Sequence, residues 1–124
     1  MLSIYRSLLV VAVLAITGCS RLSANEHRVV GTWDYPTVNA SARLVFRENH
    51  SVELLTPEPN TVPQKFSIAA SGRWRVEDAD LVYTLKFVPN NYGATPDTTF
   101  KETIVEFGPD QLVFKTGRLF SRAK

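Results

Sequence analysis

The side chain best suited to covalent chemistry in this sequence is the thiol of Cys19, the single cysteine of the 124-residue chain. A thiolate is a strong nucleophile, and a lone cysteine cannot form a disulfide within its own chain. Cys19 follows Thr17-Gly18, which follow an unbroken apolar run from Leu8 to Ile16. This setting points to export and processing rather than to an enzyme nucleophile.

The segment before Cys19 has the three parts of a secretory signal peptide. Residues 1–7 carry Arg6 and no acid, residues 8–16 are apolar, and small residues precede the cysteine. Nine helical residues span roughly 14 Å, about half of a bilayer's hydrocarbon core, so this run is too short for a transmembrane anchor. We therefore expect residues 1–18 to be a helical signal peptide that is removed.

The tetrapeptide Ile16-Thr17-Gly18-Cys19 resembles the lipobox of bacterial lipoprotein precursors. The resemblance implies cleavage before Cys19, diacylglycerol on its sulfur, and acylation of the new amine, with palmitate as a typical chain, in Gram-negative bacteria. Ser20, where inner-membrane lipoproteins usually have aspartate, implies the outer membrane and a domain that faces the periplasm. Residues 19–28 are then a lipidated tether and the membrane is a partner, because two or more acyl chains anchor stably. The alternative is an ordinary signal peptide with Cys19 there by chance.

Other chemistry-bearing residues form no recognisable motif. The two histidines, His27 and His50, have no sequence partner suited to a metal site or a triad, and we expect both on the surface. Glu77, Asp78 and Asp80 cluster without the loop pattern of a calcium site and are expected in a solvated turn. The sequence therefore predicts no catalytic residues, no metal and no cofactor other than the lipid.

Charge excludes one class of partner. Removing residues 1–18 leaves 13 basic and 12 acidic residues, and the basic residues are scattered. Nucleic-acid binding needs clustered basic charge, so no nucleic-acid partner is expected. The last seven residues, 118–124, hold three bases and no acid, which is typical of a solvated chain end.

The rest of the chain shows the two-residue alternation of β-strands. It is clearest in residues 81–88, where Leu81, Tyr83, Leu85 and Phe87 share one face. Other strand-like runs cover residues 29–35, 42–48, 51–56, 66–76, 99–107 and 111–120. No segment has convincing helical periodicity. The sequence therefore predicts an all-β domain, a small antiparallel up-and-down meander of about seven or eight strands, closed as a barrel or packed as a β-sandwich.

Two long connections interrupt the strands, at residues 56–65, with three prolines, and 89–98. Successive connections of a meander alternate between its two ends, so these two share an end with residues 36–41. Long loops gathered over a rigid scaffold often bind ligands. Tyr92, beside Asn91, is the predicted binding aromatic, and an exposed linker is the alternative.

Gly31-Thr32-Trp33 opens the first strand, Gly72-Arg73-Trp74 precedes a later hairpin, and Gly117-Arg118 lies in the last run. This pattern resembles the small bacterial lipocalin-like domains and implies a barrel over residues 29–124. The family resemblance also implies a structural plug, in which Trp33 closes one end of the barrel and the guanidinium of Arg118 lies over its indole.

Removal of the signal peptide leaves 106 residues with twelve aromatics, enough to fill much of a small barrel. We therefore expect a membrane-anchored envelope lipoprotein whose non-enzymatic barrel acts as a binding or assembly module, with an envelope protein as a partner. The alternative is a carrier of a small apolar ligand, which an open cavity above roughly 300 Å³ would favour. A cell-envelope hydrolase is a remote alternative.

Overall fold

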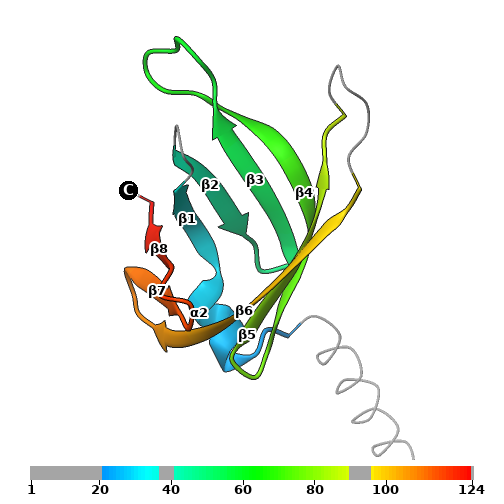
Figure 1. The fold of residues 1–124 in the computed structure, drawn as a ribbon, viewed down its shortest axis with the longest axis vertical. Coiled ribbons are helices and arrows are strands. Elements are labelled where there is room, and N and C mark those ends of the chain that lie inside the picture. Colours follow the sequence, from blue (N-terminus) through cyan, green and yellow to red (C-terminus); the bar gives the residue numbers. More distant parts are fainter. Residues whose placement is uncertain (1–20, 37–40, 90–95, 124) are drawn as a thin grey trace, which may run out of the picture.

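The computed structural model describes residues 21–36, 41–89 and 96–123, which form a closed antiparallel barrel of eight strands with one short helix (Figure 1). The predicted all-β meander is confirmed, and the β-sandwich alternative is wrong. The predicted signal helix and Cys19 lie outside the described residues. The elements are α2 (Ala24–Val29), β1 (Gly31–Pro36), β2 (Ser41–Phe46), β3 (Ser51–Pro57), β4 (Phe66–Glu77), β5 (Asp80–Phe87), β6 (Thr98–Phe107), β7 (Gln111–Phe114) and β8 (Leu119–Arg122).

Each strand pairs with the next along the chain, and β8 returns to β1, where Trp33 faces Arg122 in register. Closure removes the exposed edges that an open sheet would leave. Because side chains alternate across a strand, residues two apart point inward, and the buried apolar ones form one hydrophobic cluster. The fully buried large side chains of this core include Trp33, Phe46, Phe114, Phe120, Leu44, Leu81 and Leu112.

The barrel has two short final strands where the sequence suggested one continuous run over residues 111–120. A turn separates β7 from β8, and Gly117 adopts a φ of 91° within it, a conformation that glycine tolerates best. The amide of Phe114 donates to the carbonyl of Arg118 over 2.9 Å and holds the turn together. β8 consequently ends at Arg122 rather than at Phe120.

The two ends of the barrel differ in the connections they carry (Figure 1). We call one the long-connection end, because the strands that meet there are joined through residues 37–40, 58–65 and 88–97. The other, the tight-turn end, joins strands through residues 47–50, 78–79 and 108–110. The three longer connections share one end, as predicted, because all eight strands pair antiparallel with their neighbours in the chain.

A short helix, which was not predicted from the sequence, packs against the tight-turn end. α2 occupies part of the predicted tether, residues 19–28, so much of that segment belongs to the folded domain. Ser23 and Glu26 form a reciprocal capping box, in which each side chain accepts a hydrogen bond from the other residue's backbone amide. Among the residues that the structure describes, no helix has the length and apolarity needed to cross a membrane.

The side chain of Glu26 links α2 to the barrel through hydrogen bonds. One of its carboxylate oxygens accepts from the backbone amide of Val76 on β4 at 3.1 Å and lies 3.2 Å from Nε2 of His50. Burial by itself raises the pKa of this carboxyl, but the hydrogen bonds from Ser23, Val76 and His50 outweigh burial, and the net pKa is lowered. The prediction that both histidines lie on the surface is wrong for His50, which is half-buried, lies beside Glu26 and packs its ring against Trp74. It is confirmed for His27, which is exposed.

Glu26→Gln should destabilise the domain by about 1–3 kcal/mol at pH 7, because an amide offers one acceptor oxygen where the carboxylate satisfies three donors. A lowered folded-state pKa contributes stability above the unfolded value, about 4.3, and that stability is lost as pH falls through the folded value. The difference between wild type and variant should therefore shrink below about pH 4.

Urea unfolding measured from pH 3 to 7 would test this. A chain that begins at residue 20 is suitable, because it keeps α2, all eight strands and every core residue. His27→Gln, on the exposed face of the same helix, is the matched control and should change stability little. If the stability difference between wild type and Glu26→Gln stays constant over this pH range, the proposed role of the ionised Glu26 carboxylate is wrong.

Candidate functional site

The barrel contains a partly open cavity of about 210 Å³ with mostly apolar walls. Its lining comes from β1, β2, β3, β5 and β6, and consists of Tyr35, Leu44, Leu54, Tyr83, Leu85, Phe87 and Phe100. Tyr35 and Phe87 lie at or next to the last residues of their strands, and Phe100 lies near the first residue of β6. The cavity therefore occupies the half of the barrel nearer the long-connection end.

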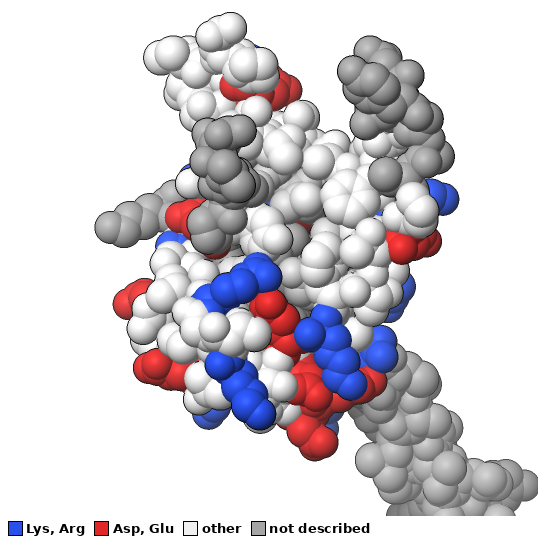
Figure 2. All heavy atoms as spheres, viewed as in Figure 1, with Lys and Arg blue, Asp and Glu red and all other residues white. Residues whose placement is uncertain are grey.

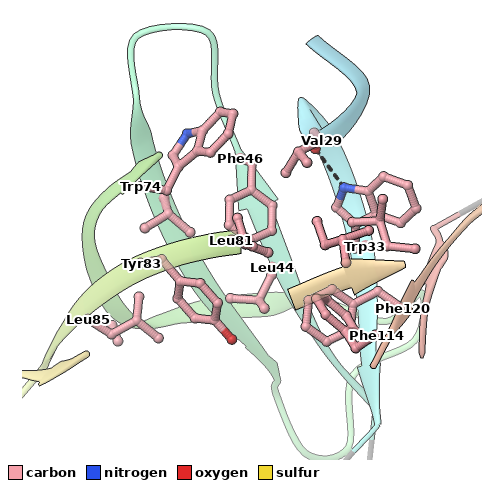
Figure 3. Packing of buried hydrophobic residues seen from close by; sticks show 14 residues of the cluster. Val29, Trp33, Leu44, Phe46, Trp74, Leu81, Tyr83, Leu85, Phe114 and Phe120 are labelled. Atoms are coloured by element: carbon pink, nitrogen blue, oxygen red, sulfur yellow. Dashed lines mark hydrogen bonds between the residues drawn. The ribbon is translucent and has the colours of Figure 1, made fainter. Parts of the chain in front are cut away.

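The other half of the interior is filled by side chains. Phe46 packs edge-on against Trp74 with ring centroids 5.4 Å apart, and Phe114 packs edge-on against Phe120 at 4.7 Å (Figure 3). Trp33 is fully buried beside them, and α2 covers this end from outside. The interior is thus divided into a packed half at the tight-turn end and a hollow half at the long-connection end.

Tyr83 stands at the boundary between the two halves. Its ring stacks on Phe100 with centroids 4.9 Å apart and planes 17° from parallel, and Phe46 contacts it edge-on at 5.7 Å. The side chain is almost fully buried, and Figure 3 shows its hydroxyl directed into the barrel interior. Burial raises the pKa of Tyr83 well above its ordinary value, and the nearby Tyr35 and Glu102 raise it further, so the hydroxyl stays protonated.

An ion pair borders the hollow half beside β7 and β8, the two shortest strands of the described barrel. β7 pairs with residues 104–107 of β6, toward the tight-turn end, and β8 pairs with Trp33 and Asp34 in the middle of β1. Glu102 faces inward opposite Leu81, and the guanidinium of Arg118 in the β7–β8 turn donates to it over 2.9 Å. The same guanidinium lies 5.5 Å from the centroid of the Tyr35 ring, so charge at the edge of the cavity is paired.

The expected plug is present, but a different arginine completes it. The guanidinium carbon of Arg122 lies 4.2 Å from the centroid of the Trp33 ring, and the indole N–H donates to the carbonyl of Val29 over 2.7 Å. The assignment of this contact to Arg118 is wrong, because Gly117-Arg118 lies in a turn and the last strand ends four residues later. Gly31 leaves the space that Arg122 occupies, since a Cβ at Gly31 would lie 2.2 Å from its Nη1 atom.

Three of the predicted site residues lie outside the described residues: Cys19, Asn91 and Tyr92. The acidic turn holds no ion-binding arrangement, because Asp80 accepts from the hydroxyl of Thr103 at 2.5 Å and lies near Lys101. Within residues 21–36, 41–89 and 96–123, no three His, Cys, Asp or Glu side chains are grouped to hold a metal ion. The cavity lining was missed as a site, although the shared face of Leu81, Tyr83, Leu85 and Phe87 was recognised as a strand face.

Arg122→Met should lower stability by about 1–2 kcal/mol, because it removes the contact with Trp33 and the hydrogen bonds to the carbonyls of Pro109 and Val30. Arg118→Met is the matched control. It removes a half-exposed ion pair and should cost less than about 1 kcal/mol. Denaturant unfolding of both variants would measure the difference, and a larger loss of stability for Arg118→Met would contradict the importance of the Arg122–Trp33 contact.

Comparison with known proteins gives a structural likeness without a close sequence relative. No family profile and no curated protein sequence matches this chain. A solved structure, that of a lipocalin-like protein from Bacteroides thetaiotaomicron, matches with a TM-score of 0.51 and 19% sequence identity, over 77% of this chain and 97% of that one. At this identity the likeness bears on architecture alone, and it shows that the chain has the fold of a lipocalin-like barrel.

Proposed function

We propose that this chain is a membrane-anchored binding module of the bacterial envelope, whose barrel holds a small, mostly apolar ligand. The cavity is the observation that supports this best. Its walls are leucine, phenylalanine and tyrosine side chains, and it lies in the half of the barrel from which the long connections extend. A concave apolar site with few polar groups is the usual form of a small-molecule site.

Its size limits the ligand. The cavity volume of about 210 Å³ falls below the roughly 300 Å³ expected of a carrier, which is also the lower bound for sites that hold drug-sized molecules, but it exceeds the roughly 150 Å³ that suffices to hold benzene. The cavity therefore suits a compact molecule of about eight or nine non-hydrogen atoms, or the end of a longer chain. A binding role also agrees with the lipocalin-like fold, and we propose no catalytic role.

A second candidate function is assembly with an envelope protein. Exposed apolar side chains lie near the long-connection end: Val62, 98% exposed, in the β3–β4 connection, Ile68 on β4 and Val88 directly after β5. Figure 2 shows that most of the charged side chains on the face it presents lie toward the tight-turn end, with both signs mixed. A weakly charged end with exposed apolar side chains is suited to a protein partner.

The anchoring part of the proposal rests on the lipobox resemblance of residues 16–19. A lipid on Cys19 would hold the domain at a membrane, and Ser20 favours the outer membrane with the domain facing the periplasm.

Cys19→Ser should abolish acylation, because a hydroxyl lacks the reactivity of the thiolate that receives the diacylglycerol. Metabolic labelling with a fatty-acid analogue, followed by membrane fractionation, measures both lipidation and location. Ser20→Ala is the control and should keep its label. Wild-type labelling of Cys19→Ser would overturn the proposed anchor.

Leu54→Phe should weaken ligand binding at least about tenfold, because the larger ring would occupy the cavity that Leu54 lines. Ethylbenzene is a suitable apolar probe, and its binding can be followed by chemical-shift changes in the chain that begins at residue 20. Leu112→Met, a volume-conserving change in the packed half, is the matched control and should bind like wild type. The cavity would be excluded as the binding site if ethylbenzene causes no chemical-shift changes at the lining residues. Equal binding by both variants would exclude it too.

A further inference from the structure

The Tyr83 hydroxyl differs from the other buried aromatic polar groups of the barrel. The indole N–H groups of Trp33 and Trp74 donate to the carbonyls of Val29 and Arg47 at 2.7 and 3.0 Å. No hydrogen bond joins the Tyr83 hydroxyl to any described residue, although the side chain is only 4% exposed. The described residues hold no fully enclosed side-chain polar atom without a partner, so this hydroxyl keeps some access to open space, and Tyr83 is one of the residues that line the cavity. A buried tyrosine hydroxyl ordinarily has a partner.

The position of this hydroxyl is fixed before any ligand arrives. Phe100 covers one face of the Tyr83 ring in a near-parallel stack, and Phe46 packs edge-on against the same ring. The strand register places Tyr83 between Trp74 and Phe100, so neighbouring strands also restrain it. A donor held in this way loses little conformational freedom when it forms a hydrogen bond, which favours binding.

The charges near the cavity favour an uncharged ligand. The guanidinium of Arg118 already pairs with Glu102 at 2.9 Å, so an anionic ligand would have to compete with a carboxylate of the protein. An ammonium would meet the same paired charges, and the remaining lining is leucine and phenylalanine with one further tyrosine. Burying an unpaired charge in such surroundings is costly, whereas burying a carbonyl with a donor is not.

We propose that the cavity selects a compact, uncharged, mostly apolar molecule with one hydrogen-bond acceptor, such as a carbonyl oxygen, to which the Tyr83 hydroxyl donates. This inference rests on the proposed function, because it names the class of ligand for the same cavity. A phenol is a better donor than acceptor and its burial keeps it protonated, so a carbonyl is a fitting complement. The ring wall of Tyr83 and Phe100 would contact the apolar body of the ligand.

Three probes of similar size test the proposed selectivity: ethylbenzene has no hydrogen-bond acceptor, acetophenone has a carbonyl oxygen, and benzoate carries a negative charge. Their dissociation constants are measured by chemical-shift titration of the chain that begins at residue 20. Wild type should bind acetophenone about tenfold more tightly than ethylbenzene, as expected for one hydrogen bond, and benzoate at least about tenfold more weakly than acetophenone. Tyr83→Phe should abolish the preference for acetophenone and leave ethylbenzene binding within about twofold of wild type, because ring and packing are kept.

Tyr35→Phe is the matched control, since it removes the other hydroxyl of the cavity lining and should keep the preference. A preference that survives Tyr83→Phe, or is lost in Tyr35→Phe instead, would overturn the role of Tyr83. Benzoate binding as tightly as acetophenone would overturn the selection for an uncharged ligand. Ethylbenzene binding without any preference for acetophenone defeats this inference alone, whereas no binding of any probe defeats the proposed function itself.

Discussion

The contact on which the rest of the barrel depends is the burial of Trp33. Its indole joins three segments at once: the N–H donates to Val29 at the end of α2, the ring lies under Arg122 of β8, and the backbone belongs to β1. The first and last strands meet here, so the contact that closes the end of the interior also closes the sheet. Gly31 makes this possible, because any larger residue would meet the Arg122 side chain. The Gly-x-Trp sequence is thereby explained by packing.

The second Gly-x-Trp sequence supports the same half of the molecule in a different way. Gly72 lies so close to β5 that a Cβ would fall 1.7 Å from the carbonyl oxygen of Thr84, and Trp74 two residues later fills the interior beside Phe46. Large rings are thus concentrated at the tight-turn end, where α2 and the turns enclose them. Leucine, tyrosine and phenylalanine side chains line the opposite half, and the space left there is the cavity. The division of the interior follows from where the bulky side chains lie along each strand.

Much of the architecture could be predicted from the sequence, because strand alternation is a local pattern and residues such as Leu81, Tyr83 and Leu85 show it plainly. The helix α2 was not predicted, because six residues are too few to show helical periodicity, although Ser23 and Glu26 have the spacing of a capping box. The split between β7 and β8 was missed because the Gly117 turn interrupts an otherwise strand-like run, and this misplaced the plug arginine. The cavity could not be predicted from composition, because its volume depends on how rings such as Phe100 and Tyr83 stack.

The place of α2 determines how an anchored domain would be oriented. The helix lies at the pole opposite the hollow half, and Asn25 reaches the carbonyl of Asp78 in the turn between β4 and β5. Cys19 precedes the helix cap at Ser23 by four residues, which extend to at most roughly 14 Å. A lipid on Cys19 would therefore keep the packed pole against the bilayer and turn the cavity away from it. Such a molecule would collect its ligand from the aqueous phase in front of the membrane rather than from among the lipids behind it.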